Sequence, residues 1–382
     1  MATIEPYEVS AGKRYRVRYR KPDRSQTTKR GFRTKREAEL FLSSIELGKA
    51  MGTYIDPAKA RITVAEIGLL WIVSQSHLKP SSMAVVESAW RLHVRPVWGT
   101  IPVGEVRHSE IQTWVARLSA GTSLKTKPKS AALVHRAHGV LFAILEVAVR
   151  DHQISSNPAH GVGLPRRGSR PHRYLTHEHL HDLAEQCGTH ATLIRLLAYT
   201  GLRWGEVTAL TVHDVDRQAR RIRVTRNAVL VNGKVIVGTP KSHKQRSVPY
   251  PELLDSSLEF ACRSKRDNEL LFPGPTGTFL ITPTIKPWSW FDQALKSASL
   301  PEMTIHDLRH TAASLVISAG ANVKAVQKML GHASAAMTLD TYADLFDDDL
   351  NTVAVRLNEA AISSNVVRMW SEARQIGATI AR

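Results

Sequence analysis

The most informative segment of the chain reads His306-Asp307-Leu308-Arg309-His310, then Leu330-Gly331-His332, then Thr338-Leu339-Asp340-Thr341-Tyr342. Side chains three residues apart share one face of a helix, so His306 and Arg309 are expected to point the same way. His332 follows a glycine that marks a turn, and Tyr342 comes from the polar stretch after it. The pattern predicts that one domain brings two histidines, an arginine and a tyrosine together.

A second arginine lies upstream, in Thr200-Gly201-Leu202-Arg203-Trp204-Gly205-Glu206. Guanidinium groups bind phosphate oxygens through paired N–H groups, and an activated phenol can act as a nucleophile. Two arginines, two histidines and one tyrosine can therefore bind a phosphodiester and attack it. An ordinary ion pair with Glu206 is the alternative for Arg203, and Glu206 is expected to orient Arg203 rather than to act chemically.

In this order and with these gaps, the motifs resemble the tyrosine recombinase (phage integrase) family. The resemblance implies that Tyr342 is the nucleophile and that Arg203 and Arg309 neutralise the phosphate oxygens. His306 fits a proton-transfer role near neutral pH. His332 fits a hydrogen-bond donor to phosphate, and His310 is expected to be structural.

The family's general acid is a lysine on a β-hairpin, and residues 239–249 resemble that hairpin. Lys241 matches best, and Lys244 remains the alternative. We expect no cofactor and no ATP requirement, because a phosphotyrosine conserves the energy of the cleaved bond. We also expect no metal. His306 and His310 are spaced like a metal-binding pair, but Asp307 stands where the zinc-protease pattern has glutamate, and no cysteine or carboxylate cluster completes a coordination shell.

Composition points to a polyanionic partner. The chain has 382 residues, enough for two or three domains, and a net charge of +18. The sequence lacks an uninterrupted apolar run of about 18 residues and the apolar core of a secretory signal, so no membrane partner is expected. Cys187 and Cys262 are too few for a disulfide framework and suit a reducing cytoplasm. The charge alone does not distinguish DNA from RNA or from an acidic membrane surface, whereas the family resemblance implies double-stranded DNA in the bacterial cytoplasm.

Residues 1–60 read as a separate basic module. Arginines alternate with apolar residues in the segment 14–20, so a strand would put Tyr15, Val17 and Tyr19 on one face and the arginines on the other. Thr34 and Glu37 form a helix-capping pattern, and the helix that follows has an apolar side of Leu40, Phe41, Ile45 and Leu47. The pattern is similar to the family's arm-type DNA-binding domain, a three-stranded sheet plus helix. A solvated charged face is the alternative.

Residues 61–160 read as helical and resemble the family's core-type DNA-binding domain. Thr63, Ser81 and Ser109 mark three helix starts, residues 96–99 break the second helix, and a fourth helix spans 131–149. A basic linker, 161–172, follows. The candidate DNA-binding residues in these regions and in the N-terminal module are Arg14, Arg16, Arg18, Arg20, Lys29, Arg30, Arg33, Lys125, Lys127, Lys129, Arg166 and Arg167.

Residues 173–360 read as a mainly α catalytic domain with a small antiparallel sheet, which makes the whole chain α+β. Segments 221–224 and 235–237 alternate like strands around the Asn232-Gly233 turn, and 247–249 adds a third strand. An amphipathic stretch over 353–360 packs either on its own domain or on a neighbouring subunit. Residues 361–382 form a tail.

The resemblance implies a site-specific recombinase that cuts one DNA strand through a 3′-phosphotyrosine and exchanges strands through a Holliday junction. It also implies a homotetramer on DNA, with accessory DNA-bending or excision factors as further partners. A type IB topoisomerase shares the tyrosine chemistry, but the arm-like module argues against it. A DNA-binding regulator that has lost catalysis is the other alternative, and the retained polar residues argue against that one.

Overall fold

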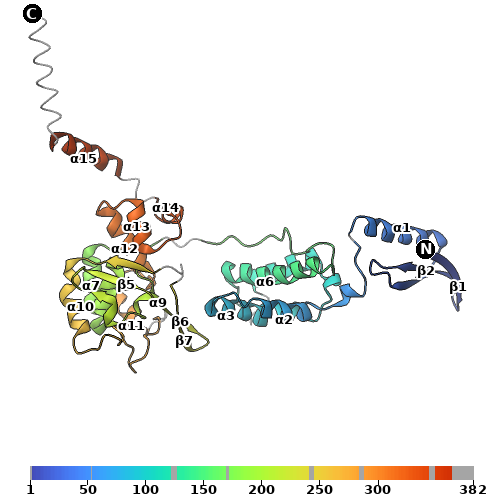
Figure 1. Ribbon diagram of the computed structural model, residues 1–382, viewed down its shortest axis with the longest axis horizontal. Coiled ribbons are helices and arrows are strands. Elements are labelled where there is room, and N and C mark those ends of the chain that lie inside the picture. Colours follow the sequence, from blue (N-terminus) through green and yellow to red (C-terminus); the bar gives the residue numbers. More distant parts are fainter. Residues whose placement is uncertain are drawn as a thin grey trace, which may run out of the picture. The chain divides into compact units, whose positions relative to one another are not determined.

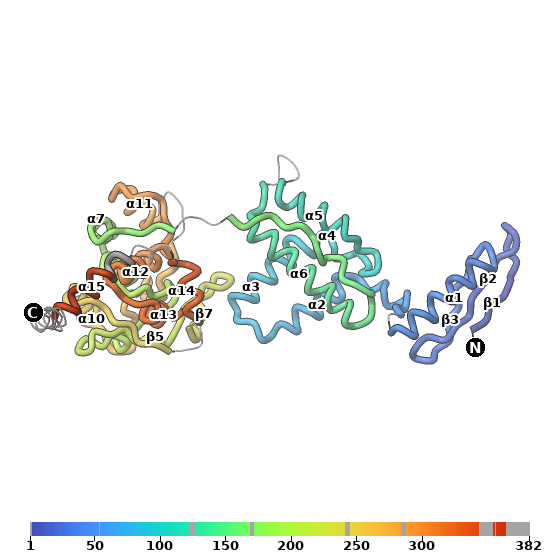
Figure 2. Tube along the Cα trace, turned by 90° about the horizontal axis from the view of Figure 1, so that it is seen from above, coloured from blue at the N-terminus to red at the C-terminus, as the bar shows by residue number. Residues whose placement is uncertain are grey.

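The computed structural model describes residues 2–52, 54–121, 127–168, 172–240, 245–283, 288–343 and 349–363. It divides into two compact units, Met1–Ser169 and Arg170–Arg382, which can be followed by colour along the chain (Figures 1 and 2). The α+β class is confirmed. The finer domain boundaries stay predictions, and Lys125, Lys241, Lys244 and most of the 361–382 tail lie outside the described residues.

The first unit begins with a three-stranded antiparallel sheet in the order β1 (Thr3–Val9), β2 (Gly12–Arg20), β3 (Gln26–Phe32), followed by helix α1 (Lys35–Ala50). This confirms the predicted sheet plus helix. The Thr34 hydroxyl accepts a hydrogen bond from the Glu37 amide at 3.1 Å, as the capping pattern predicted. Val17 and Tyr19 are buried against Ala38 of α1.

One part of the α1 prediction is wrong. Phe41 and Ile45 pack on the sheet, but the side chains of Leu40 and Leu47 are 64% and 62% exposed. The helix therefore uses only half of its predicted apolar side, because a three-stranded sheet covers a narrow strip of a helix.

The helical part of the first unit contains α2 (Val64–Ser74), α3 (Pro80–Ala89), α4 (Arg95–Trp98), α5 (His108–Ala120) and α6 (Ala131–Arg150). Thr63 and Glu66 form a capping box at the start of α2. A π-helical turn over Trp90–Val94 joins α3 to α4, and the chain stays helical to Trp98, so the second helix ends within the predicted segment 96–99. Pro96 directly follows the π-helical turn, in which the Arg95 N–H donates to the Trp90 carbonyl.

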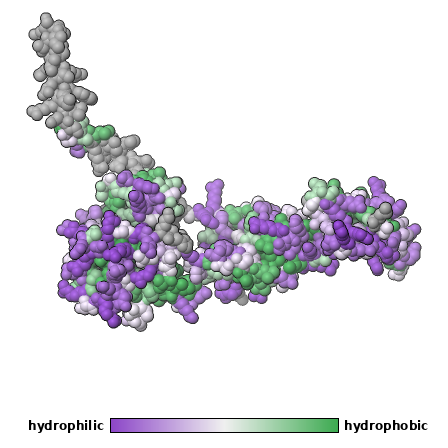
Figure 3. All heavy atoms as spheres, viewed as in Figure 1, coloured by the Kyte–Doolittle hydropathy of each residue, from purple (hydrophilic) through white to green (hydrophobic). Residues whose placement is uncertain are grey.

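Close packing in this part requires a glycine. A Cβ on Gly68 of α2 would lie 2.4 Å from the Trp90 ring. The outer side of α2 carries exposed Leu69, Leu70 and Val73, and Figure 3 shows apolar surface on the helical part of the unit. Helix α6 is long and apolar enough to cross a membrane by length and composition alone. Eight of its residues are buried in the core of the unit, as expected of a core helix.

The second unit surrounds a core formed mainly by α7 (His177–Gln186), α8 (Ala191–Thr200), α11 (Trp290–Ser297) and a small sheet. The sheet has the order β4 (Val215–Asp216), β5 (Arg221–Val224), β8 (Arg246–Pro249), and a separate hairpin pairs β6 (Asn227–Val231) with β7 (Lys234–Gly238). The Asn232-Gly233 turn is confirmed, with φ of 49° and 80°. The predicted strand pairing is wrong, since β5 pairs with β4 and β8 rather than across that turn.

The motif-bearing helices of the second unit are α9 (Trp204–Val207), α12 (Asp307–Ser318), α13 (Val323–Leu330) and α14 (Ala335–Tyr342). Helix α10 (Asp255–Cys262) contacts α8, and α15 (Asp349–Ser363) follows α14 in the chain. Val355 and Leu357 of α15 are exposed, so whether this helix packs on its own domain or on a neighbour stays open.

Candidate active site

Two glycine-terminated helices bring the motifs together. Helix α8 ends at Gly201 and α13 ends at Gly331, both in the left-handed conformation with φ of 62° and 67°. A Cβ on Gly201 would lie 2.5 Å from Leu330 Cδ2. Glycine at 201 therefore permits both the tight turn and the close approach of the α13 end.

Arg203 follows this turn and is the N-cap residue of α9. Its side chain donates to Glu206 Oε1 at 2.9 Å, and its backbone N–H donates to Glu206 Oε2 at 2.9 Å. It also reaches the Gly331 carbonyl at 3.4 Å. With 22% of the side chain exposed, the guanidinium is held in place yet remains accessible to a ligand.

Glu206 is fully buried and binds a second arginine that the sequence analysis missed. Arg246 of β8 donates to both carboxylate oxygens, at 2.9 and 2.6 Å, and to the Met329 carbonyl at 3.2 Å. Burial alone would raise the pKa of Glu206, but the hydrogen bonds and charge of Arg246, with those of Arg203, hold it below the ordinary value. Glu206 is thus a charged anchor for two arginines, which confirms its contact with Arg203.

Arg309 lies on α12 and is buried. Its two terminal nitrogens donate to the carbonyls of Gly201 and Leu330, where α8 and α13 end. Burial and the charge of Arg203 lower the pKa of Arg309 to about 9, so it remains charged at pH 7. Partners in the described part of the chain take two of the five guanidinium N–H donors, so others can bind an anion.

His332 stands directly after the α13 cap. Its Nδ1 lies 3.0 Å from the Thr338 hydroxyl, and its ring lies parallel to the Tyr342 ring, within 8° and with centroids 6.4 Å apart. Burial and the nearby Arg309 lower the pKa of His332 to about 4. The ring is therefore neutral at pH 7 and carries one N–H that can donate.

Tyr342 is the last residue of α14 and is only 2% exposed. Its hydroxyl lies 2.9 Å from Nδ1 of His310. Burial raises the pKa of Tyr342 to about 12, although the charge of Arg309 opposes the shift. Among the described residues, the hydrogen-bond partner of this hydroxyl is thus His310, whereas His306 was expected to handle protons.

His306 caps α12, and its ring centroid lies 5.3 Å from that of His310. Burial and the charge of Arg309 lower its pKa. The structure thus brings together five predicted residues, Arg203, His306, Arg309, His332 and Tyr342, and adds Arg246 and His310. Their chemical roles, and that of Lys241, stay predictions.

One group of side chains resembles a metal site. His172, Asp307 and His310 have possible ligand atoms within 4.8 Å of one another. However, Asp307 Oδ2 already accepts from the Thr304 amide and hydroxyl, and Nδ1 of His310 faces Tyr342. We therefore interpret the group as a hydrogen-bonded cluster, and metal independence stays a prediction.

The candidate DNA-binding residues lie in several places. The strand register puts Arg30 on the same face of the N-terminal sheet as Arg14, Arg16, Arg18 and Arg20, whereas Lys29 lies opposite Val17 on the other face. On the arginine face, Glu5 pairs with Arg16 at 2.7 Å and with Arg18 at 3.6 Å, which uses part of the positive charge.

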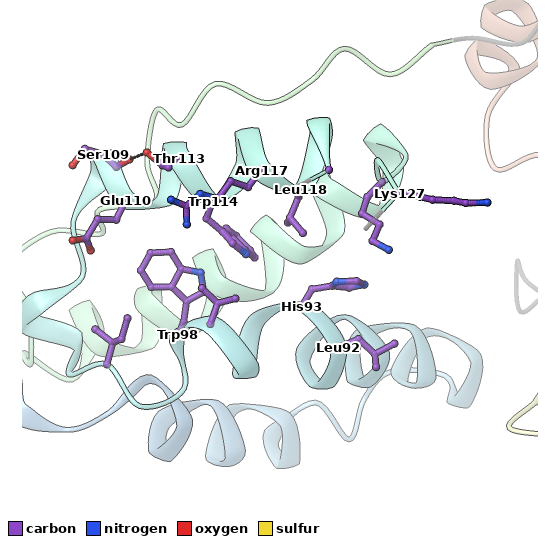
Figure 4. A pocket seen from close by; sticks show the side chains of 14 residues that line it. Leu92, His93, Trp98, Ser109, Glu110, Thr113, Trp114, Arg117, Leu118 and Lys127 are labelled. Atoms are coloured by element: carbon purple, nitrogen blue, oxygen red, sulfur yellow. Dashed lines mark hydrogen bonds between the residues drawn. The ribbon is translucent and has the colours of Figure 1, made fainter. Parts of the chain in front are cut away.

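In the helical part, Lys127 and Lys129 line a cavity of about 770 Å³ together with Arg117 and His93. Figure 4 shows Lys127 at one end of the group of side chains that line the cavity, which includes Trp98 and Trp114. Arg33, Arg166 and Arg167 are exposed.

Comparison with known proteins identifies the family. Residues 173–348 match the model of the phage integrase family. The integrase of Mycobacterium phage D29 is 28% identical over 292 residues, 74% of this chain and 75% of the phage protein. The Tn1549 transposon integrase in complex with a circular intermediate DNA has a TM-score of 0.63 at 23% identity, over 78% of this chain and 99% of its own. A lambda integrase tetramer bound to a Holliday junction has a TM-score of 0.55 at 17% identity, over 86% and 96%. The last two likenesses reflect the fold, while the family match covers every motif from Arg203 to Tyr342, and residues 173–348 therefore form a domain of the phage integrase family.

Proposed function

We propose that the protein is a site-specific DNA recombinase that cleaves and rejoins DNA through Tyr342. The observation that carries the proposal is the convergence of Tyr342 with Arg203, Arg309 and His332 around the ends of α8 and α13. The arginines supply positive charge, the histidine supplies a donor and the tyrosine supplies the attacking oxygen.

A phosphodiester resists attack because its anionic oxygens repel nucleophiles and its alkoxide is a poor leaving group. In the proposed step, Tyr342 Oη attacks phosphorus and the bond to the 5′ oxygen breaks, which leaves a 3′-phosphotyrosine and a 5′-hydroxyl. Arg203 and Arg309 neutralise the non-bridging oxygens, each lowering the barrier by roughly 3–4 kcal/mol, by analogy with an oxyanion donor. Lys241 is the proposed acid for the 5′ oxygen.

The reverse step rejoins strands without ATP, because the phosphotyrosine conserves the energy of the broken bond. Attack by the 5′-hydroxyl of a partner duplex would exchange strands through a Holliday junction. We propose a homotetramer as the active assembly, supported by the fold shared with the lambda integrase tetramer bound to such a junction. Accessory DNA-bending or excision factors belong to the same proposal.

The test is the Tyr342→Phe variant on a half-site substrate from which the short fragment that carries the new 5′-hydroxyl diffuses away after cleavage. Phenylalanine keeps the ring and loses only the attacking oxygen. We expect parental DNA binding and complete loss of the covalent protein–DNA band on denaturing gels. A persistent band would remove Tyr342 from the mechanism.

The half-site substrate tests one alternative and supercoiled DNA tests the other, and the family comparisons favour neither. A regulator without catalysis would give no covalent adduct with the parent protein. A topoisomerase would relax supercoiled DNA and form no recombinants.

The N-terminal sheet is proposed to read a second class of DNA site. Its outer face carries Arg14, Arg16, Arg18, Arg20 and Arg30 against one carboxylate, Glu5. Deleting residues 1–60 should spare cleavage at core sites and abolish binding to the second class. Each lost phosphate contact should lower the slope of log affinity against log salt by about 0.9. Identical footprints and salt slopes for the full-length and truncated proteins would contradict this role.

A further inference from the structure

The hydroxyl of Tyr342 already faces a proton acceptor. His310 Nδ1 lies 2.9 Å from Tyr342 Oη, within the range of a strong hydrogen bond. The tyrosine is buried, so bulk water cannot readily take its proton. His310 directly follows Arg309 on α12, and one helix therefore supplies both a phosphate ligand and the acceptor.

The surroundings of His310 hold its ring in place. The ring of His172 lies 3.9 Å from it, centroid to centroid, with planes 30° apart. His306 meets it edge-on at 5.3 Å. A carboxylate oxygen of Asp307 lies within 4.8 Å of a ring nitrogen, where it can stabilise an imidazolium.

Electrostatics keep the resting ring neutral. Burial, His172, His306 and, more weakly, Arg309 lower the pKa of His310 to about 4, while Asp307 opposes the shift. Within the described part of the chain, Tyr342 from α14 is a further titratable group in contact with it. A neutral imidazole with its proton on Nε2 has a free lone pair on Nδ1, directed at the phenol.

We propose that His310 is the base for the nucleophile and that His172 positions it. As the Oη–P bond forms and the bond to the 5′ oxygen breaks, the phenolic proton moves to Nδ1 of His310. The 5′ oxygen takes a separate proton from the general acid assigned above. In rejoining, His310 returns its proton to Oη. This assignment rests on the proposed recombinase function and moves the first proton transfer from His306 to His310.

The experiment measures single-turnover cleavage of the half-site substrate by the full-length protein across pH 6–9. His310→Asn keeps a hydrogen-bonding group near the Nδ1 position but cannot take up a proton. We expect parental DNA binding and a cleavage rate lower by about 10²–10⁴-fold at pH 7. The remaining rate should rise about tenfold per pH unit, because attack then depends on prior loss of the phenolic proton, whereas the parent rate should stay nearly flat. His181→Asn, an exposed histidine on α7, is the matched control and should behave as the parent.

A second substrate tests which oxygen the base serves. Sulfur in place of the bridging 5′ oxygen leaves without a proton, so it should rescue loss of the general acid but not His310→Asn. Rescue of His310→Asn would place His310 at the leaving group and overturn the proposal. His310→Gln, tested in the same way, replaces His310→Asn if that variant unfolds.

The role of His172 is tested by a pair of variants. His172→Ala removes the stacked ring and should slow cleavage and steepen its pH dependence, while His172→Phe keeps an aromatic ring and should restore most of the rate.

If the parent forms no covalent complex, the recombinase proposal itself fails. If the parent cleaves and His310→Asn matches its rate and pH profile, only the assignment of His310 fails.

Discussion

Glu206→Gln is the most demanding test of the site's architecture. The Glu206 carboxylate is completely buried and accepts four hydrogen bonds, two from Arg203 and two from Arg246. Glutamine has nearly the same shape but replaces one acceptor oxygen with an N–H₂ donor. That donor would face guanidinium donors, and two arginines would lose their shared counter-charge.

The expected cost follows from this geometry. Removing one partner of a buried ion pair costs about 3–5 kcal/mol, mostly because the remaining charge is left uncompensated. For a unit of this size, each kcal/mol shifts the unfolding midpoint by roughly 2–4 °C, which gives a fall of roughly 6–20 °C. Arg203 would also lose its anchor, and a displacement of about 1 Å can slow a reaction by about a hundredfold.

The assay combines thermal unfolding of the full-length protein with single-turnover cleavage at a temperature where the variant is folded. Glu259→Gln is the matched control. Its pair with Arg217 is 3.1 Å long but half exposed on both sides, so its loss should cost less than about 1 kcal/mol. Equal unfolding midpoints for the two variants would refute the claim that Glu206 anchors the arginines.

Two further predictions concern metal and pH. Cleavage should proceed in EDTA, since Arg203 and Arg309 supply the positive charge that a metal would bring. A strict need for added metal in the chemical step would contradict this and point to the group of His172, Asp307 and His310 as the metal site. Acid should destabilise the protein, because His310 and His332 have folded pKa values of about 4 against an ordinary 6.5. Between pH 4 and 6.5 the unfolded chain therefore binds more protons than the folded one. The contribution of the two histidines to the free energy of unfolding is complete above pH 6.5 and is lost as the pH falls toward 4. Unfolding midpoints measured from pH 7 to 4 should fall less steeply for His332→Asn, and an unchanged slope would exclude this residue as a cause.

Local signals predicted much of the fold. The Thr34 and Thr63 caps depend on residues three positions away, and both helices begin where the capping patterns place them. Exposure was harder to predict. Leu40 and Leu47 were expected on the apolar side of their helix, yet both are exposed, because apolar spacing does not say how much of a helix meets a neighbour.

The sequence of the turn could have corrected the predicted pairing of the strands on either side of Asn232-Gly233. A two-residue turn at Asn232-Gly233 pairs Val231 directly with Lys234, so the partner strand has to end at residue 231. The segment 221–224 lies too far upstream for that register.

The missed site residues have no comparable local signal. Arg246 reaches Glu206 across 40 positions of sequence, and His310 reaches Tyr342 across 32. Family motifs could name Tyr342 and Arg309, but only the folded structure shows that His310 is the histidine that faces the phenol. His172 lay in a predicted linker and had no feature that tied it to α12.

The charge of the assembled site suits phosphate binding and leaves recognition of the DNA sequence to other parts of the chain. Arg203, Arg246 and Arg309 surround a single carboxylate, Glu206, so two positive charges remain uncompensated among these side chains. Their repulsion contributes to the low pKa values of His332 and Arg309. A phosphodiester relieves this excess, and binding energy at the site is therefore directed to the phosphate. Because phosphates are alike at every step of a duplex, they carry no sequence information. The choice of DNA site has to come from residues outside the cluster, which is why the basic sheet and the lysines of the helical part are the places to test for it.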